Sequence, residues 1–214
     1  MLNSVRIIAG TFRSRSLQAP AGLSTRPTSD RLRETIFNVL ATRIDGAAFL
    51  DLYAGSGAVG MEALSRGAAH VTFVEKAPSA LTVLRVNLGR LGLNSGFSIQ
   101  SCGVGAFLRR PQTAPAAFDL VFLDPPYDAD QEYSTTLGLL GGAAAGLLAP
   151  GALVLAEHRR QDRLADRYGS LQRTRLLQQG DASLSFYAVP AVATDQPVTQ
   201  QETVASQEPV PPQK

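Results

Sequence analysis

Short apolar runs alternate along the chain with segments whose apolar residues recur at helical spacing. Seven runs predict strands, at residues 48–52, 71–75, 97–101, 118–123, 152–157, 171–177 and 184–189. Four intervening segments predict helices, over residues 57–66, 79–91, 104–109 and 130–148. Strands that alternate with helices are typical of a parallel, doubly wound sheet. Because the last two runs follow each other without a helix, they predict an antiparallel pair. We therefore expect an α/β, Rossmann-like fold with a mixed sheet of seven strands.

The N-terminal part carries a different pattern. Residues 6–10 and 16–18 predict a short basic hairpin, joined through residues 11–15. A loop follows, and then a helix that Thr28, Ser29 or Asp30 is able to cap. One face of this helix is apolar, with Leu32, Ile36, Val39 and Leu40. We expect a hairpin extension over residues 1–27, a single domain over 28–189, and a disordered tail over 190–214, which has no aromatic residue and no periodicity.

A glycine-rich segment follows the run at 48–52 and opens the next helix. Gly55, Gly57 and Gly60 match the pattern G-x-G-x-x-G, and Glu75 lies 20 residues past Gly55. This layout is typical of a site for an adenosine-containing cofactor, with the acid on the ribose hydroxyls. Asp51, four residues before Gly55, favours S-adenosylmethionine, because its carboxylate would attract an α-ammonium and repel a pyrophosphate. A helix-capping role for Asp51, and a solvated strand-end position for Glu75, remain alternatives.

The run at 118–123 ends in Asp124-Pro125-Pro126-Tyr127. Two prolines fix the backbone and remove two N–H donors, so the turn presents acceptors beside an aromatic ring. The Asp124 side chain and the Pro125 carbonyl would hold the two protons of an exocyclic base amine and aim its lone pair at a methyl group. Tyr127 would stack on a flipped base, a contact worth ~1–3 kcal/mol. The alternative is a plain turn.

The amino-acid composition limits the functional classes to which this protein can belong. Residues 1–43 hold seven arginines against two acids, which suggests a polyanionic partner, although a solvated basic face would have the same composition. One cysteine and two histidines make a disulfide framework and a metal site improbable. Cys102 is better explained as a small buried residue than as a nucleophile. We found neither a signal peptide nor a membrane span, so we expect a cytoplasmic protein.

Four motifs together resemble the RsmD family of bacterial 16S ribosomal RNA guanine-N2 methyltransferases. The resemblance covers about residues 5–189 and rests on residues 6–10 with Arg13, Arg15 and Leu17, on residues 26–38, on residues 51–68 with 73–75, and on residues 122–127. The stretch 26–38 is the most specific, because general methyltransferases lack it. The resemblance implies transfer of one methyl group from S-adenosylmethionine to the 2-amino group of a guanine in small-subunit rRNA, on an assembling or assembled 30S particle.

The motifs and the resemblance assign roles to named residues. The expected catalytic residues are Asp124, Pro125, Pro126 and Tyr127. The expected cofactor-binding residues are Asp51, Tyr53, Ala54, Gly55, Ser56, Gly57, Glu75, Lys76, Gly103, Val104 and Asp124, together with Arg26 and Glu34 from the family stretch. The expected RNA-binding residues are Arg6, Arg13, Arg15 and Arg31. Gly103 stands where the family often has a polar residue, so adenine would be recognised by backbone groups near Gly103 and Val104.

Three other functions compete with this one. A DNA adenine or cytosine amino-methyltransferase shares the Asp-Pro-Pro-Tyr motif but usually carries a large target-recognition insert. A non-catalytic RNA-binding assembly factor would have no need for Gly55, Gly57, Glu75 and the 124–127 motif together. An NAD enzyme would have no use for Asp124–Tyr127. The absence of an additional domain favours a monomer.

Overall fold

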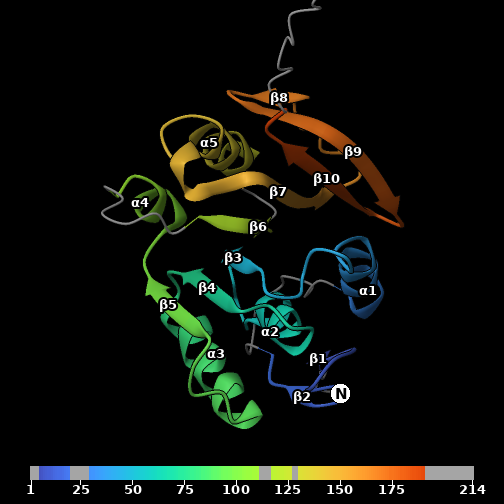
Figure 1. Cartoon of the computed structure of the whole chain (residues 1–214), viewed down its shortest axis with the longest axis vertical. Helices are drawn as coiled ribbons and strands as arrows, with labels where there is room; N and C mark the ends of the chain where they lie inside the picture. Colours follow the sequence, from blue (N-terminus) through green and yellow to red (C-terminus); the bar gives the residue numbers. More distant parts are fainter. Residues whose placement is uncertain (1–4, 20–28, 111–116, 127–129, 191–214) are drawn as a thin grey trace, which may run out of the picture.

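Figure 1 shows the computed structural model, which describes residues 5–19, 29–110, 117–126 and 130–190. In these ranges eight strands form one sheet in the order β5-β4-β3-β6-β7-β10-β9-β8. The parallel part comprises β3 (Ala48–Leu52), β4 (His70–Glu75), β5 (Phe97–Ser101), β6 (Phe118–Leu123) and β7 (Leu148–Arg159). The antiparallel part comprises β8 (Arg167–Tyr168), β9 (Leu171–Gln179) and β10 (Ala182–Ala188). The predicted doubly wound, mixed sheet is confirmed, with the two-residue β8 as one strand more than expected.

Helices cover both faces of the sheet (Figure 1). The helices α1 (Asp30–Val39), α2 (Ala58–Ser65) and α3 (Pro78–Leu91) share one apolar core with Phe49, Phe73 and Phe122. The helices α4 (Val104–Leu108) and α5 (Asp130–Leu140) share the other with Leu50 and Leu123. Neighbouring residues of a strand enter different cores because side chains alternate between the two faces of a sheet.

The N-terminal hairpin has the expected form. Its strands β1 (Val5–Arg6) and β2 (Ser16–Leu17) pair antiparallel and lie against α2 and α3. Helix α1 starts after Ser29, whose side-chain oxygen accepts a hydrogen bond from the Leu32 N–H at 3.2 Å. Ser29 is therefore the N-cap among the three predicted candidates.

The helix predicted over residues 130–148 is shorter than expected. It ends at Leu140, and the chain continues through turns into the 3-10 helix η1 (Ala145–Leu147). Gly141 explains part of the difference, because a Cβ atom there would lie 1.8 Å from the Tyr168 carbonyl oxygen. The glycine permits this close approach but weakens the helix. Across the described ranges, no helix combines the length and the apolar character needed to cross a membrane.

Candidate active site

The candidate site lies where the carboxyl ends of the parallel strands meet. After β3 the chain proceeds outward through β4 and β5, and then returns to place β6 on the opposite side of β3. The order therefore reverses between β3 and β6, which is the position where open α/β sheets bind ligands. Asp51 lies at the end of β3, and Asp124 directly follows β6. Topology thus brings together two acids that are 73 positions apart in the sequence.

The predicted glycine loop connects β3 to α2. Gly57 is the N-cap of α2 and has a φ of 79°, in the left-handed region that favours glycine. Gly55 also has a positive φ, of 55°, and a Cβ atom there would meet no atom closer than 3.9 Å. Gly60 has a packing role, since a Cβ atom there would lie 2.3 Å from the Phe73 ring. The loop therefore keeps one side open at Gly55 while the following helix packs closely on the sheet.

Asp51 is a buried carboxylate held by the helix it precedes. Its side chain is 2% exposed, and Oδ2 accepts a hydrogen bond from the Gly60 N–H at 2.9 Å. Burial, with a smaller contribution from the charge of Glu75, raises the pKa of Asp51 to about 7, although the Gly60 hydrogen bond opposes the shift. Asp51 is not the N-cap of α2, which is Gly57, but its carboxylate does accept from an N–H of the first turn of that helix. A positive charge placed beside Asp51 would favour its ionised form.

Glu75 joins the glycine loop to the end of β4. Its Oε2 accepts from the Gly55 N–H at 2.8 Å, and its Oε1 accepts from the N–H groups of Lys76 and Ala77, each at 2.7 Å. A carboxylate offers about four acceptor positions. Three of them are occupied by backbone groups of the described residues. The structure therefore orients Glu75 firmly and leaves room for one further donor, such as a single hydroxyl.

Asp124 has an acidic neighbour that the sequence analysis did not identify. Leu123 on β6 pairs with Ala156 on β7, so Asp124 and Glu157 occupy the next positions of adjacent strands. Glu157 is 4% exposed. Burial first, then the charges of Glu157 and Asp51, raise the pKa of Asp124 well above its ordinary range. A carboxyl group in this environment binds a proton more tightly than an exposed one does.

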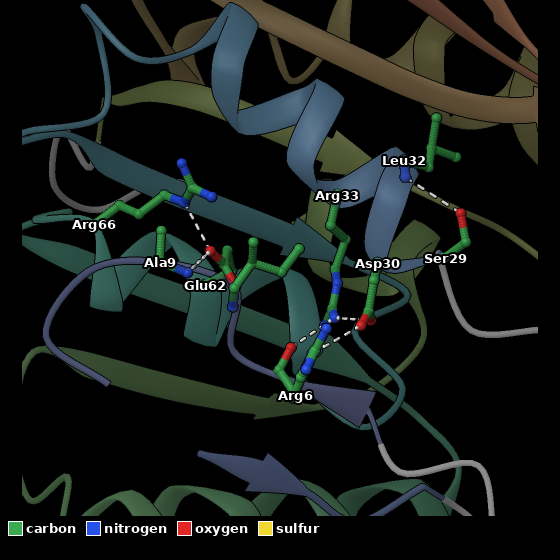
Figure 2. A network of polar contacts seen from close by, with 9 residues as sticks. Arg6, Ala9, Ser29, Asp30, Leu32, Arg33, Glu62 and Arg66 are labelled. Carbon is green, nitrogen blue, oxygen red and sulfur yellow. Dashed lines mark hydrogen bonds and ion pairs between the residues drawn. The ribbon is translucent and has the colours of Figure 1, made fainter. Parts of the chain in front are cut away.

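A second polar network fixes the hairpin to the glycine-loop helix (Figure 2). Glu62 of α2 is fully buried and accepts hydrogen bonds from the N–H groups of Ile8 at 2.7 Å and Ala9 at 3.0 Å. It also forms an ion pair with Arg66 at 2.7 Å. Because a buried charge needs such partners, these contacts set the position of the hairpin relative to the site.

Arg33 connects the same hairpin to α1, as Figure 2 shows. Its guanidinium is fully buried, donates to the Arg6 carbonyl oxygen at 2.7 Å and pairs with Asp30 at 2.7 Å. Within the part of the chain that the structure describes, its Nε and Nη1 have no hydrogen-bond partner. Burial lowers the pKa of Arg33, while the charges of Asp30 and Glu62 oppose that shift. Helical spacing places Arg33 next to the predicted apolar stripe, but nothing in the sequence indicates that it is buried.

The other predicted cofactor-binding residues lie in several environments. The main chain of Ala54 and Ser56 is part of the glycine loop, where Ala54 N–H donates to the Val74 carbonyl oxygen and Ser56 O accepts from Asn87. Tyr53 instead directs its hydroxyl to α5, where it bonds Glu132 and Thr136, each at 2.7 Å. Its backbone has a φ of 62°, which is unusual for a residue with a side chain.

The remaining candidates lie at the surface or near α4. Gly103 is the N-cap of α4, and a Cβ atom there would meet no atom of the described residues within 4 Å, while Val104 is buried. Lys76 and Glu34 are exposed. So are the predicted RNA-binding residues Arg6, Arg13, Arg15 and Arg31. Arg26 and Tyr127 lie outside the described residues.

The residues at this edge fit S-adenosylmethionine. The open side of Gly55 and the open space at Gly103 leave room for a ligand across the ends of β3, β4 and β5. Asp51 and Glu75 are acids at the ends of adjacent strands, suited to an ammonium group and to a ribose hydroxyl. The described residues contain no group of three or more metal-binding side chains.

A family model and several known proteins match this chain. A family model described as Conserved hypothetical protein 95 matches residues 5–188. "Putative rRNA methyltransferase YlbH" of Bacillus subtilis (strain 168) is 36% identical over 183 residues, which are 86% of this chain and 98% of that protein. "Ribosomal RNA small subunit methyltransferase D" of Haemophilus influenzae is 45% identical over 125 residues, which are 58% of this chain and 64% of that protein. The solved structure "Putative methyltransferase yhhF" from Escherichia coli has a TM-score of 0.73 at 33% identity, and the match covers 86% of this chain and 97% of that one.

Proposed function

Because the chain belongs to the Conserved hypothetical protein 95 family, which is the RsmD family of the sequence resemblance, we propose that it methylates the exocyclic 2-amino group of a guanine in 16S rRNA. The observation that carries the proposal is the placement of Asp124-Pro125-Pro126 beside Asp51 at the switch point of the sheet. This edge combines an acceptor array for an amine with an acid suited to a cationic cofactor.

Asp124 and Pro125 would position the nucleophile. The carboxylate of Asp124 accepts one N–H of the guanine amine, and the Pro125 carbonyl accepts the other. With both protons held, the nitrogen lone pair points away from them and toward the methyl donor. The raised pKa of Asp124 suits it to take up the proton that the amine loses once the new N–C bond has formed. Tyr127 would stack on the base.

S-adenosylmethionine, when bound, supplies an electrophilic methyl group on a sulfonium. Asp51 would accept from its α-ammonium, and Glu75 from one ribose hydroxyl, through the acceptor position that its three backbone contacts leave. The backbone around Gly55 and Gly57 would line the cofactor-binding site. Backbone groups at Gly103 and Val104 would meet the adenine, and Lys76, Arg26 and Glu34 would also contribute to cofactor binding. The positive charge of the bound cofactor would also favour the ionised form of both Asp51 and Asp124.

The hairpin would hold the RNA. Arg6, Arg13 and Arg15 are exposed on one small element that Glu62 anchors to α2, directly after the glycine loop. Guanidinium groups there would bind phosphates without reading sequence. We place the protein in the cytoplasm and expect a monomer that acts on the 30S subunit or its precursor.

The test is methyl transfer from labelled S-adenosylmethionine to 30S particles that lack the modification, with free rRNA and DNA as alternative substrates. Asp124→Asn should abolish transfer, and its affinity for S-adenosylmethionine, measured separately, should fall far less than its rate of transfer. Asp119→Asn is the matched control, because Asp119 lies on the same strand, where its Oδ2 accepts from the Ala48 N–H at 2.8 Å. Transfer to DNA and not to 30S particles would refute the proposal that rRNA is the substrate. Full activity of Asp124→Asn would refute the proposed role of Asp124 in catalysis.

The role of the hairpin has its own measurement. RNA affinity would be determined at several salt concentrations for the wild type and for the double variant Arg13→Ala/Arg15→Ala. Loss of two phosphate contacts should reduce the slope of log affinity against log salt by roughly 1.4 to 1.8. An unchanged slope would mean that these arginines do not contact phosphates.

A further inference from the structure

A cavity of 310 Å³ lies between α1 and the β9–β10 hairpin, beside the candidate active site. Its walls are Arg31, Leu32 and Thr35 of α1 together with Leu177, Gln178, Gln179 and Leu184. The Thr35 hydroxyl and the Gln179 amide form a hydrogen bond of 2.8 Å, which joins the helix to the hairpin. None of these residues except Arg31 was predicted to have a function.

The cavity is at the same edge of the sheet as Asp124. Leu184 pairs directly with Glu157 across β10 and β7, and Glu157 is the neighbour of Asp124 on the adjacent strand. Strands lie about 4.8 Å apart, so Leu184 is separated from Asp124 by two strand spacings, or roughly 10 Å. A nucleotide adjacent to a base held at Asp124 would reach this distance.

The lining suits a nucleobase better than a phosphate. Leu177 is partly exposed and supplies apolar surface to the cavity, while Leu32 and Leu184 are almost fully buried and form its closed floor. Beyond their mutual hydrogen bond, Gln179 keeps its amide N–H donors and Thr35 keeps acceptor lone pairs, and Arg31 donates, so the lining offers both donors and an acceptor to the edge of a base. A phosphate offers acceptors only, so an acceptor in the lining would find no partner on it. The volume lies at the lower end of the roughly 300–1,000 Å³ of small-ligand sites, enough for one base.

We propose that this cavity binds the base of a nucleotide that flanks the target guanine, with Arg31 and Gln179 at its edge. This inference rests on the proposed rRNA methylation and adds a source of sequence selectivity that Asp124-Pro125-Pro126 lacks. An enzyme that flips its target base commonly reads the neighbouring nucleotides as well. In this protein the neighbouring base would be contacted by α1, which belongs to the family-specific stretch, and by the antiparallel end of the sheet.

The test is a double-mutant cycle between the protein and the RNA. Small subunits would be reconstituted with rRNA that carries an abasic residue at one or the other position flanking the modified guanine. The Kd of the wild type, Arg31→Ala and Gln179→Ala would be measured for intact and abasic particles. At one position, base removal should weaken wild-type binding about tenfold, and Arg31→Ala should weaken binding to intact particles similarly. The two changes together should cost about tenfold and not a hundredfold, because each removes the same contact.

Two controls separate the possible outcomes. Arg90→Ala removes the same charge from the last turn of α3, away from the cavity, and should leave the abasic effect unchanged. Multiplicative effects of Arg31→Ala and base removal, or an Arg31→Ala variant that binds like the wild type, would overturn the inference. If the proposed function itself is wrong, the wild type will transfer no methyl group to intact particles, which is a different observation.

Discussion

Asp51→Asn tests whether burial of a charged group at the end of β3 serves the cofactor at the expense of stability. Asparagine has the shape of aspartate, and its amide oxygen still accepts from the Gly60 N–H, so this hydrogen bond to the first turn of α2 is retained. Only the ionisable group is lost. The substitution therefore isolates the electrostatic contribution of one carboxyl group that is 2% exposed.

The magnitude follows from the pKa of this carboxyl group. It is raised to about 7 in the folded protein, chiefly by burial, and lies near 4 in an unfolded chain. The folded state thus holds a proton that the unfolded state has released across this interval, so the unfolding free energy of the wild type falls as the pH rises from about 4 to about 7. Each pKa unit corresponds to ~1.4 kcal/mol, which gives ~4 kcal/mol in total. Asp51→Asn lacks this dependence.

Urea unfolding of both proteins at several pH values, without cofactor, provides the assay. The stability of Asp51→Asn relative to the wild type should increase by about 3 kcal/mol between about pH 5 and pH 8. Calorimetric titration at pH 8 should show weaker binding of S-adenosylmethionine by the variant, because an amide offers no charge to the α-ammonium. Stability and affinity would then change in opposite directions. A stability difference that is constant with pH would refute the electrostatic argument, and unchanged affinity would remove Asp51 from the cofactor site.

Three further changes test other parts of the structure. Glu157→Gln removes a charge that raises the pKa of Asp124, so the acid limb of the kcat–pH profile should move to lower pH; a limb that stays in place or moves upward would contradict the coupling. Gly60→Ala forces a Cβ atom to 2.3 Å from a ring on β4 and should cost ~1–3 kcal/mol in urea unfolding, whereas Gly89→Ala on α3, with nothing within 4 Å, should be neutral or slightly stabilising. Glu62→Gln should cost about 3 kcal/mol and speed hydrogen exchange at the two hairpin amides it binds; unchanged exchange would show that the hairpin is held by other contacts.

Much of the fold follows from local patterns. The strands β3, β5 and β6 have the predicted bounds, because an apolar run bounded by turn residues is a local property of the chain. The glycine loop was also predictable, since the φ values of Gly55 and Gly57 reflect a requirement that only glycine meets at low cost. The helix after β6 was predicted too long, because its end depends partly on a close approach to β8 that no local signal reports.

The sequence by itself determined the order of the elements, the family and the two motifs at the strand ends, because spacing along the chain encodes them. Only the tertiary structure decided which charges are buried. Arg33, Glu62 and Glu157 look like ordinary surface residues in the sequence, yet each is at least 96% buried in the folded protein. Their burial arises from contacts between distant segments: α1 with the hairpin, the hairpin with α2, and β6 with β7. The environment that raises the pKa of Asp124 is created by this packing, because burial and neighbouring charge are properties of the assembled sheet edge.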